Sequence, residues 1–197
     1  MMDALTVAEK LCGPPTDADG AHATLPRESG LYAWWAPPGS LSDVSGPAHP
    51  SLDGLELLYV GLAQDLRTRV GRNHLRGPTG SSTLRRALVA LLMSSEGYRT
   101  RWTTDRVVPV DADEERLSDW MRAHLRLTWA VHPDPPAVEA SVIAELTPPL
   151  NQRDNTAHPL YGTIRAARAA YRASAGPRPQ RTGWSSPRHD PVPGSRG

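Results

Sequence analysis

The sequence has a single cysteine, Cys12, among its 197 residues. One cysteine excludes an internal disulfide framework and a zinc site built from several thiolates. No stretch approaches the run of about 18 or more apolar residues that a membrane-spanning helix needs. The first ten residues, MMDALTVAEK, also lack a basic segment followed by an apolar one. We therefore expect no secretory signal, no membrane association and a reducing, cytoplasmic location.

The charge of the chain is small overall but unevenly distributed. The formal net charge is +1 for the whole sequence, which by itself indicates no particular partner. Residues 1–63 carry a net charge of −6, whereas residues 64–101 carry eight arginines and two acids, a net charge of +6. A local basic segment of this kind is typical of a surface that contacts a phosphate backbone.

The apolar pattern predicts a small α+β fold. Residues 30–36 (GLYAWWA) and 55–63 (LELLYVGLA) are suited to two buried strands, paired across a long loop at 37–53. Residues 98–104 alternate like an edge strand, and 125–131 are a further strand candidate. Residues 13–29 are rich in Pro, Gly and Asp and are expected to be a loop. We predict a mainly antiparallel sheet of three to four strands, flanked by helices.

Helices are predicted between these strands. Asp65 is a suitable N-cap for the first, and Ser81 or Ser82 for the second, which carries an apolar face from Leu84 to Leu92. A third helix follows the acidic residues at 113–115, and two more are expected at 136–146 and about 159–173. The tryptophans at 34, 35, 102, 120 and 129 are expected to lie in the core.

One carboxylate is out of place in the predicted helix at 136–146. At about 100° per residue, Glu139 falls inside the apolar sector formed by Val138, Val142 and Ile143. A carboxylate there is costly unless it is paired, hydrogen-bonded or bound to a metal ion. Glu139 is therefore a candidate functional residue, the alternative being a buried structural ion pair. Glu145 lies at the edge of the sector and is expected to be a surface charge.

Four segments in a fixed order carry a family resemblance. They are GLY at 30–32, YVG at 59–61, RVGRNH at 69–74 and VEASVIAELTPPLN at 138–151. Together they resemble the GIY-YIG endonuclease superfamily. The resemblance implies a catalytic domain at 28–151 that cleaves DNA with the help of a metal ion. Around it we expect an N-terminal extension at 1–27, a packed helix within 152–173, and a disordered Pro/Arg-rich tail at 174–197.

The resemblance also implies a role for each site residue. Tyr32 would act as general base, for which nearby positive charge must favour its phenolate over the free pKa of about 10. Tyr59 would hold the nucleophile network, Arg69 would neutralise charge on the scissile phosphate, and His74 would assist. Glu139 would bind Mg²⁺ or Mn²⁺. The remaining implied positions are Asn151, which would brace the site, and Gly30 and Gly61, which permit close backbone approach.

The arginine assignment remains open at the level of sequence. The family places its histidine four residues after the catalytic arginine, whereas His74 follows Arg69 by five. Arg67, Arg69 and Arg72 therefore all remain candidates. The other arginines of this region are expected to contact DNA phosphates, and the set with that role is Arg67, Arg72, Arg76, Arg85 and Arg86.

Two other functional readings are compatible with the sequence. The chain could be a nucleic-acid-binding module that has lost turnover, or it could run a different reaction on the same scaffold. No zinc finger, helix-turn-helix signature or second globular domain is evident. Target choice would then come from loops, the arginine-bearing tail, a protein partner or a homodimer.

Arginine contacts to phosphates predict a steep dependence of DNA affinity on salt. Each neutralised phosphate releases counterions, so the logarithm of the binding constant should fall linearly with the logarithm of salt concentration. Fluorescence anisotropy with a labelled duplex between about 50 and 200 mM salt measures this slope. A flat profile would indicate a substrate other than nucleic acid.

Overall fold

The strand β2 (Gly30–Ala36) forms the centre of the molecule. It pairs on one side with β3 (Glu56–Ala63) and on the other with β6 (Arg126–Val131), both antiparallel. The short strand β1 (Thr16–Asp17) adds to the far side of β6, so the sheet order is β1-β6-β2-β3. All seven residues of β2 are buried, because both faces of the sheet are covered. The predicted mainly antiparallel sheet of three to four strands, and the pairing of residues 30–36 with 55–63, are confirmed.

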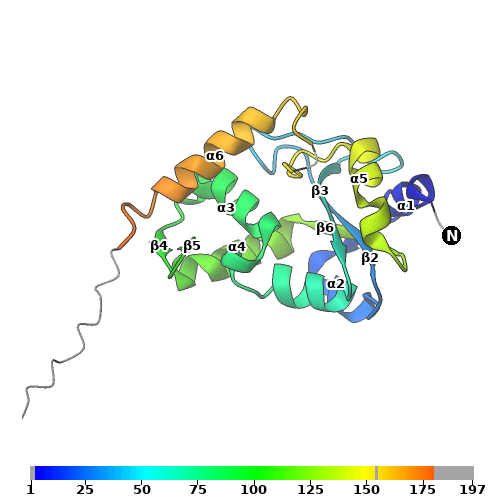
Figure 1. Ribbon diagram of the computed structural model, residues 1–197, viewed down its shortest axis with the longest axis horizontal. Helices are drawn as coiled ribbons and strands as arrows, with labels where there is room; N and C mark the ends of the chain where they lie inside the picture. The colour runs from blue at the N-terminus through cyan, green and yellow to red at the C-terminus, as the bar shows by residue number, and fades with distance from the viewer. Residues whose placement is uncertain (1–2, 154, 180–197) are drawn as a thin grey trace, which may run out of the picture.

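The computed structural model describes residues 3–153 and 155–179, and helices flank the sheet on both faces (Figure 1). Leu31, Ala33 and Trp35 of β2 pack in a small core with helices α1 (Ala4–Leu11) and α5 (Pro135–Leu146). The alternate residues Tyr32 and Trp34 belong to the larger core on the opposite face. Four helices contribute to that core: α2 (Ala18–Thr24), α3 (Thr83–Glu96), α4 (Asp111–His124) and α6 (Tyr161–Ala173).

Two helix caps predicted from the sequence are confirmed. The Asp65 carboxylate accepts a hydrogen bond from the Thr68 backbone N–H at 2.8 Å. Ser82 accepts one from the Arg85 N–H at 3.1 Å and so begins α3. The helix after Asp65 departs from regular α geometry, because residues Thr68–His74 form a π-helix, η1. A short 3₁₀ turn, η2 (Thr79–Ser81), connects it to α3.

The prediction of a loop at 13–29 is wrong. Residues Ala18–Thr24 form α2, in which three alanines, the strongest helix formers, stand beside a glycine and an aspartate. Ala18, Ala21 and Leu25 are completely buried in the larger core, so tertiary packing stabilises a helix of seven residues, which is too short to be stable by itself.

The predicted edge strand at 98–104 is also different in the structure. Only Thr100–Trp102 forms a strand, β4, and it pairs with β5 (Val107–Pro109) in a separate two-stranded sheet. The segment after α6 bonds to this hairpin: the Ser174 hydroxyl lies 2.7 Å from that of Thr100, and the Trp102 indole N–H donates to the Gly176 backbone carbonyl. Residues 174–179, expected to be disordered, are therefore ordered by these contacts. The rest of the predicted tail, 180–197, lies outside the described residues.

None of the helices in the described ranges has the length and apolar content needed to cross a membrane.

Candidate active site

The site is built on the register between β2 and β3. Tyr32 pairs directly with Gly61, and Tyr59 lies diagonally across on the same face of the sheet, with the two ring centroids 6.4 Å apart. Gly61 has no side chain, and the Tyr32 ring occupies that space. A Cβ atom at Gly61 would lie 2.5 Å from the Tyr32 hydroxyl oxygen and 2.9 Å from the Tyr59 ring. Gly30 permits a close approach of another kind, since a Cβ there would lie 2.3 Å from the Ala130 carbonyl of β6.

Asn151 fixes the edge of β3 at the residue between Tyr59 and Gly61. The Asn151 Nδ2 donates to the Val60 carbonyl at 2.7 Å, and the Val60 N–H donates to Asn151 Oδ1 at 2.9 Å. β3 is an edge strand, so these two backbone groups have no strand to pair with. The amide of Asn151 replaces that strand and holds the tyrosine-bearing segment in place, which agrees with the bracing position predicted for it.

The π-helix η1 explains the five-residue gap between Arg69 and His74. In a π-helix the hydrogen bonds run over five residues, as in the bond from the Leu75 N–H to the Val70 carbonyl at 3.1 Å. Residues five apart then lie on one side of the helix, as residues four apart do in an α-helix. Arg69 and His74 consequently both point toward Tyr32, and the extra residue is absorbed within the turn.

A pocket of about 470 Å³ brings the predicted residues together. Tyr32, Tyr59, Arg69 and Glu139 all line it. Arg69 is thus the one of the three candidate arginines that lines this pocket: Arg67 donates instead to the Leu25 carbonyl at 2.7 Å, and Arg72 is exposed. The wall is completed by Leu62, Ala63, Gln64, Asp65, Thr68 and Asn73.

A comparison with protein-family models gives a match to the GIY-YIG catalytic domain over residues 30–170. The match covers well over half of the chain and includes every side chain of the pocket. The chain belongs to the GIY-YIG family. This family is of the nuclease type, which indicates endonuclease activity in general and dependence on a divalent metal ion. No curated protein and no solved structure matches the chain.

His74 connects the GIY-YIG tyrosine to the interior of the protein. It is completely buried, with Nε2 2.6 Å from the Tyr32 hydroxyl and Nδ1 2.8 Å from the Ser82 hydroxyl. Burial, and then the charges of Arg69 and Arg85, hold the pKa of His74 well below its ordinary value. The ring is therefore neutral at pH 7, and one of its two nitrogens can accept a proton.

The pKa of Tyr32 is raised, contrary to the expectation that the site favours its phenolate. Burial is the largest cause and the neighbouring Tyr59 adds to it, while the charge of Arg69 and a hydrogen bond from it act in the opposite direction. The pKa of Tyr59 is raised as well, first by burial, with Arg69 again opposing. Both residues are phenols in the resting site, because desolvation outweighs the nearby positive charge.

The prediction that Arg85 contacts DNA is wrong. Its side chain is 1% exposed and bridges to the Glu114 carboxylate at 2.8 Å. It also donates to the Ser118 hydroxyl and to the His74 carbonyl, at 3.0 and 2.9 Å. A guanidinium with these partners is unavailable to a phosphate, and instead it positions His74.

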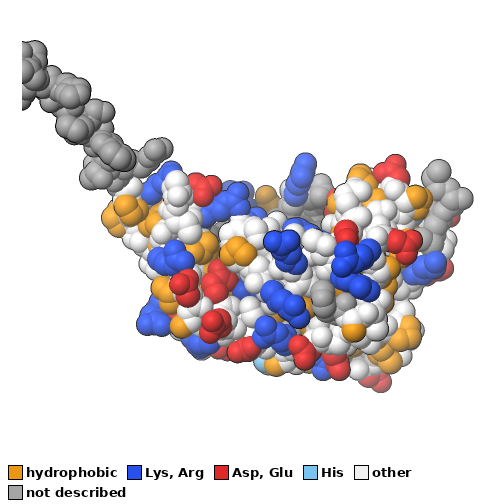
Figure 2. Space-filling model, turned by 90° about the horizontal axis from the view of Figure 1, so that it is seen from below, with side chains coloured by type: hydrophobic (Ala, Val, Ile, Leu, Met, Phe, Trp, Pro, Cys, Tyr) orange, Lys and Arg blue, Asp and Glu red, His pale blue; other side chains and the backbone are white. Residues whose placement is uncertain are grey.

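The other arginines predicted to bind nucleic acid fall into two groups. Arg72 and Arg76 are exposed on or just after η1 and remain available to phosphates. Arg67 and Arg86 are half-buried, and Arg86 donates to the Gly80 carbonyl at 2.7 Å. The basic segment of 64–101 therefore forms no single surface, and Figure 2 shows Lys and Arg side chains recurring over one face with acidic side chains among them.

Glu139 fits a metal ion that keeps most of its water. Within the described residues, no group of three or more His, Cys, Asp or Glu side chains is placed to hold a metal ion. A lone carboxylate suits Mg²⁺ or Mn²⁺, which take one or two protein oxygens and fill the other positions with water and phosphate oxygens. Glu139 is half-buried on α5 and lines the pocket, whereas Glu145 on the same helix is exposed, as predicted.

Two polar residues of the site were not singled out from the sequence. Asn73 lines the pocket, and it lies within the RVGRNH segment that carries the resemblance. The sequence predicts Ser81 or Ser82 as a helix cap, but the second contact of Ser82, to His74, depends on the turn that returns α3 to η1. No local pattern indicates such a contact.

The buried neutral His74 should destabilise the protein in acid. Below the ordinary histidine pKa of about 6.5, the unfolded chain binds a proton at His74 that the folded chain excludes. The free energy of unfolding therefore decreases as the pH falls. This effect approaches about 1.4 kcal/mol per pH unit. Urea unfolding at pH 7.5 and 5.5 measures it. We expect His74→Gln to lose less stability between these pH values than the wild type or the control His124→Gln, and equal losses would contradict the assignment.

Proposed function

We propose that the protein is a metal-dependent endonuclease that hydrolyses DNA phosphodiester bonds in the pocket of Tyr32, Tyr59, Arg69 and Glu139. The observation that carries the proposal is the convergence of these four side chains from β2, β3, η1 and α5 on one pocket. Hydrolysis of a phosphodiester needs an activated water, stabilisation of charge on the phosphoryl oxygens, and help for the leaving oxygen.

Proton transfer runs from the attacking water through Tyr32 to His74. Tyr32 is a phenol, so to accept a proton from water it passes its own proton to another base. Nε2 of His74 lies 2.6 Å from the phenol oxygen and would accept the proton in the tautomer whose Nδ1 donates to the Ser82 hydroxyl, 2.8 Å away. Tyr32 is then unchanged and His74 becomes an imidazolium. The negative charge of the bound phosphate offsets the cost of that buried cation.

Arg69 and Glu139 supply the charges of the site. Arg69 is a permanently charged fork that can bind two phosphoryl oxygens of the scissile group. Glu139 would hold the divalent metal ion, which supplies charge neutralisation at the leaving oxygen when bound. Tyr59 lies within the electrostatic reach of both residues and would hold the water by a hydrogen bond.

The catalytic unit that we propose is residues 28–151, with α6 packed on it. Ile164 and Tyr171 of α6 are buried in the larger core. Arg72 and Arg76, exposed on and just after η1, would contact phosphates away from the scissile bond.

Replacement of Glu139 should abolish cleavage without abolishing binding. We expect Glu139→Ala to lower the nicking rate of supercoiled plasmid, with Mg²⁺ or Mn²⁺, by at least about 100-fold, the scale found when one charge-stabilising group is removed. DNA affinity measured by anisotropy should change little, because the arginines are intact.

Glu145→Ala is the matched control, since it removes the same charge from an exposed position of the same helix. This variant should cleave at the wild-type rate. Retained cleavage by Glu139→Ala would overturn the metal assignment. Absence of cleavage by all three proteins, with DNA binding intact, would favour a binding module.

A further inference from the structure

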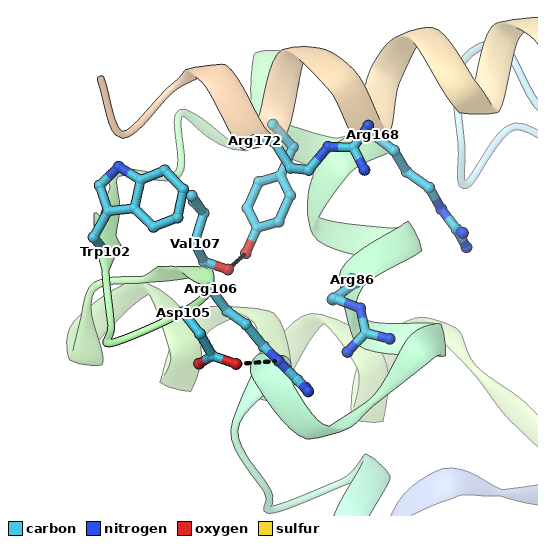
Figure 3. A pocket seen from close by; sticks show the side chains of 8 residues that line it. Arg86, Trp102, Asp105, Arg106, Val107, Arg168 and Arg172 are labelled. Carbon is cyan, nitrogen blue, oxygen red and sulfur yellow. Dashed lines mark hydrogen bonds and ion pairs between the residues drawn. The ribbon is translucent and has the colours of Figure 1, made fainter. Parts of the chain in front are cut away.

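A second pocket, of about 380 Å³, is lined by four arginines (Figure 3). Arg168 and Arg172 come from α6, Arg86 from α3, and Arg106 from the turn between β4 and β5. Asp105 is the one acid among the lining residues, and it lies 3.4 Å from Arg106. The pocket therefore carries an excess of positive charge.

Two of these arginines lie close together because they share one hydrogen-bond acceptor. Arg86 and Arg106 both donate to the Gly80 carbonyl. Burial, and next the charge of Arg106, lower the pKa of Arg86. Packing like charges together is unfavourable unless an anion compensates it, so this arrangement indicates a ligand of negative charge.

Arg168 is left incompletely satisfied. Its Nε and one terminal nitrogen are buried, and no hydrogen-bond partner for them occurs among the described residues. Burial, and then the charge of Arg86, lower its pKa. Buried guanidinium N–H groups almost always have an acceptor. Because the described residues offer none to these Arg168 nitrogens, we expect the acceptor to belong to a bound molecule.

The walls of the pocket are fixed in place. The Tyr171 hydroxyl donates to the Val107 carbonyl at 2.8 Å and attaches α6 to β5. Trp102 forms one side and donates to Gly176, so it stands at the margin of the core and not within it, contrary to the sequence-based expectation. A preformed pocket of this kind requires little reorganisation on binding.

The pocket is close to the active site. Tyr59 lines the active-site pocket, and the charges of Arg168 and Arg86, which line the arginine pocket, act with that of Arg69 to lower the pKa of its hydroxyl. A strand bound at Arg69 could therefore extend across Tyr59 to the arginine pocket.

We propose that the arginine pocket binds a second phosphate group of the DNA strand that is cleaved, and so sets the position of that strand relative to Tyr32 and Glu139. The inference rests on the proposed function. Guanidinium forks match phosphate oxygens in geometry, and several arginines suit the charge of a phosphate better than that of a single carboxylate. The phosphate is either an internal phosphodiester or the terminal phosphate of a strand end.

Binding in the absence of metal tests the pocket separately from cleavage. We expect Arg168→Met to weaken binding of a labelled duplex, in EDTA, by about tenfold and to reduce the magnitude of the salt slope by about one. Arg165→Met removes the same charge from an exposed position of the same helix, where the side chain lies over the Tyr161 ring. This control should change affinity by less than about twofold. Equal losses in the two variants, with unchanged melting temperatures, would overturn the proposal.

Two further binding measurements distinguish the source of the phosphate. A duplex with and without a 5′-terminal phosphate is compared first. An Arg168→Met loss confined to the phosphorylated duplex supports a terminal phosphate, and an equal loss on both supports an internal one. If the wild type binds no DNA, the proposed function fails and inorganic phosphate is titrated calorimetrically. If the wild type binds inorganic phosphate and Arg168→Met does not, the pocket is retained as a phosphate site. If the wild type binds no phosphate, the proposal is overturned.

Discussion

The placement of Tyr32 over Gly61 is the constraint on which the candidate site depends. The antiparallel register of β2 and β3 sets these two residues opposite each other, and only a residue without a side chain leaves room for the Tyr32 ring. The register is fixed from outside by Asn151, whose amide bonds to both backbone groups of Val60 on the free edge of β3. Any shift of β3 by one residue would reverse the faces of its side chains and remove Tyr59 from the pocket.

A buried polar chain holds the other side of Tyr32. It runs from the phenol through His74 to Ser82, which accepts from the Arg85 backbone N–H, and the Arg85 guanidinium in turn donates to Glu114 on α4. Each member has a partner, which makes burial of an arginine and a histidine tolerable in a core of leucines and alanines. The same arrangement explains why a segment so rich in arginine forms no uniform basic surface: some arginines organise the interior, and others face the pockets. His74 and Arg85 therefore contribute both to the stability of the core and to the position of Tyr32.

The sequence was sufficient for the parts of this account that depend on local patterns. The apolar runs at 30–36 and 55–63, the caps at Asp65 and Ser82, and the carboxylate of Glu139 within an apolar sector all predicted what the structure shows. It was insufficient where distant contacts decide the outcome. The helix α2 depends on tertiary packing, the role of Arg85 depends on Glu114, and the choice of Arg69 depends on a π-helix that no apolar period indicates. The arginine pocket joins α3, α6 and the β4–β5 turn, and its members are separated by up to 86 positions in the chain.

The most direct measurement of the central claim is the cleavage rate of Gly61→Ala. A methyl group there would displace the Tyr32 ring, and a displacement of about 1 Å in a catalytic group can cost about 100-fold in rate. Gly20→Ala serves as control, because a Cβ at Gly20 meets no atom within 4 Å. The account predicts that Gly61→Ala nicks plasmid at least about 100-fold more slowly than the wild type, while its circular dichroism and duplex affinity are unchanged and Gly20→Ala is fully active. Wild-type cleavage by a folded Gly61→Ala protein would contradict it.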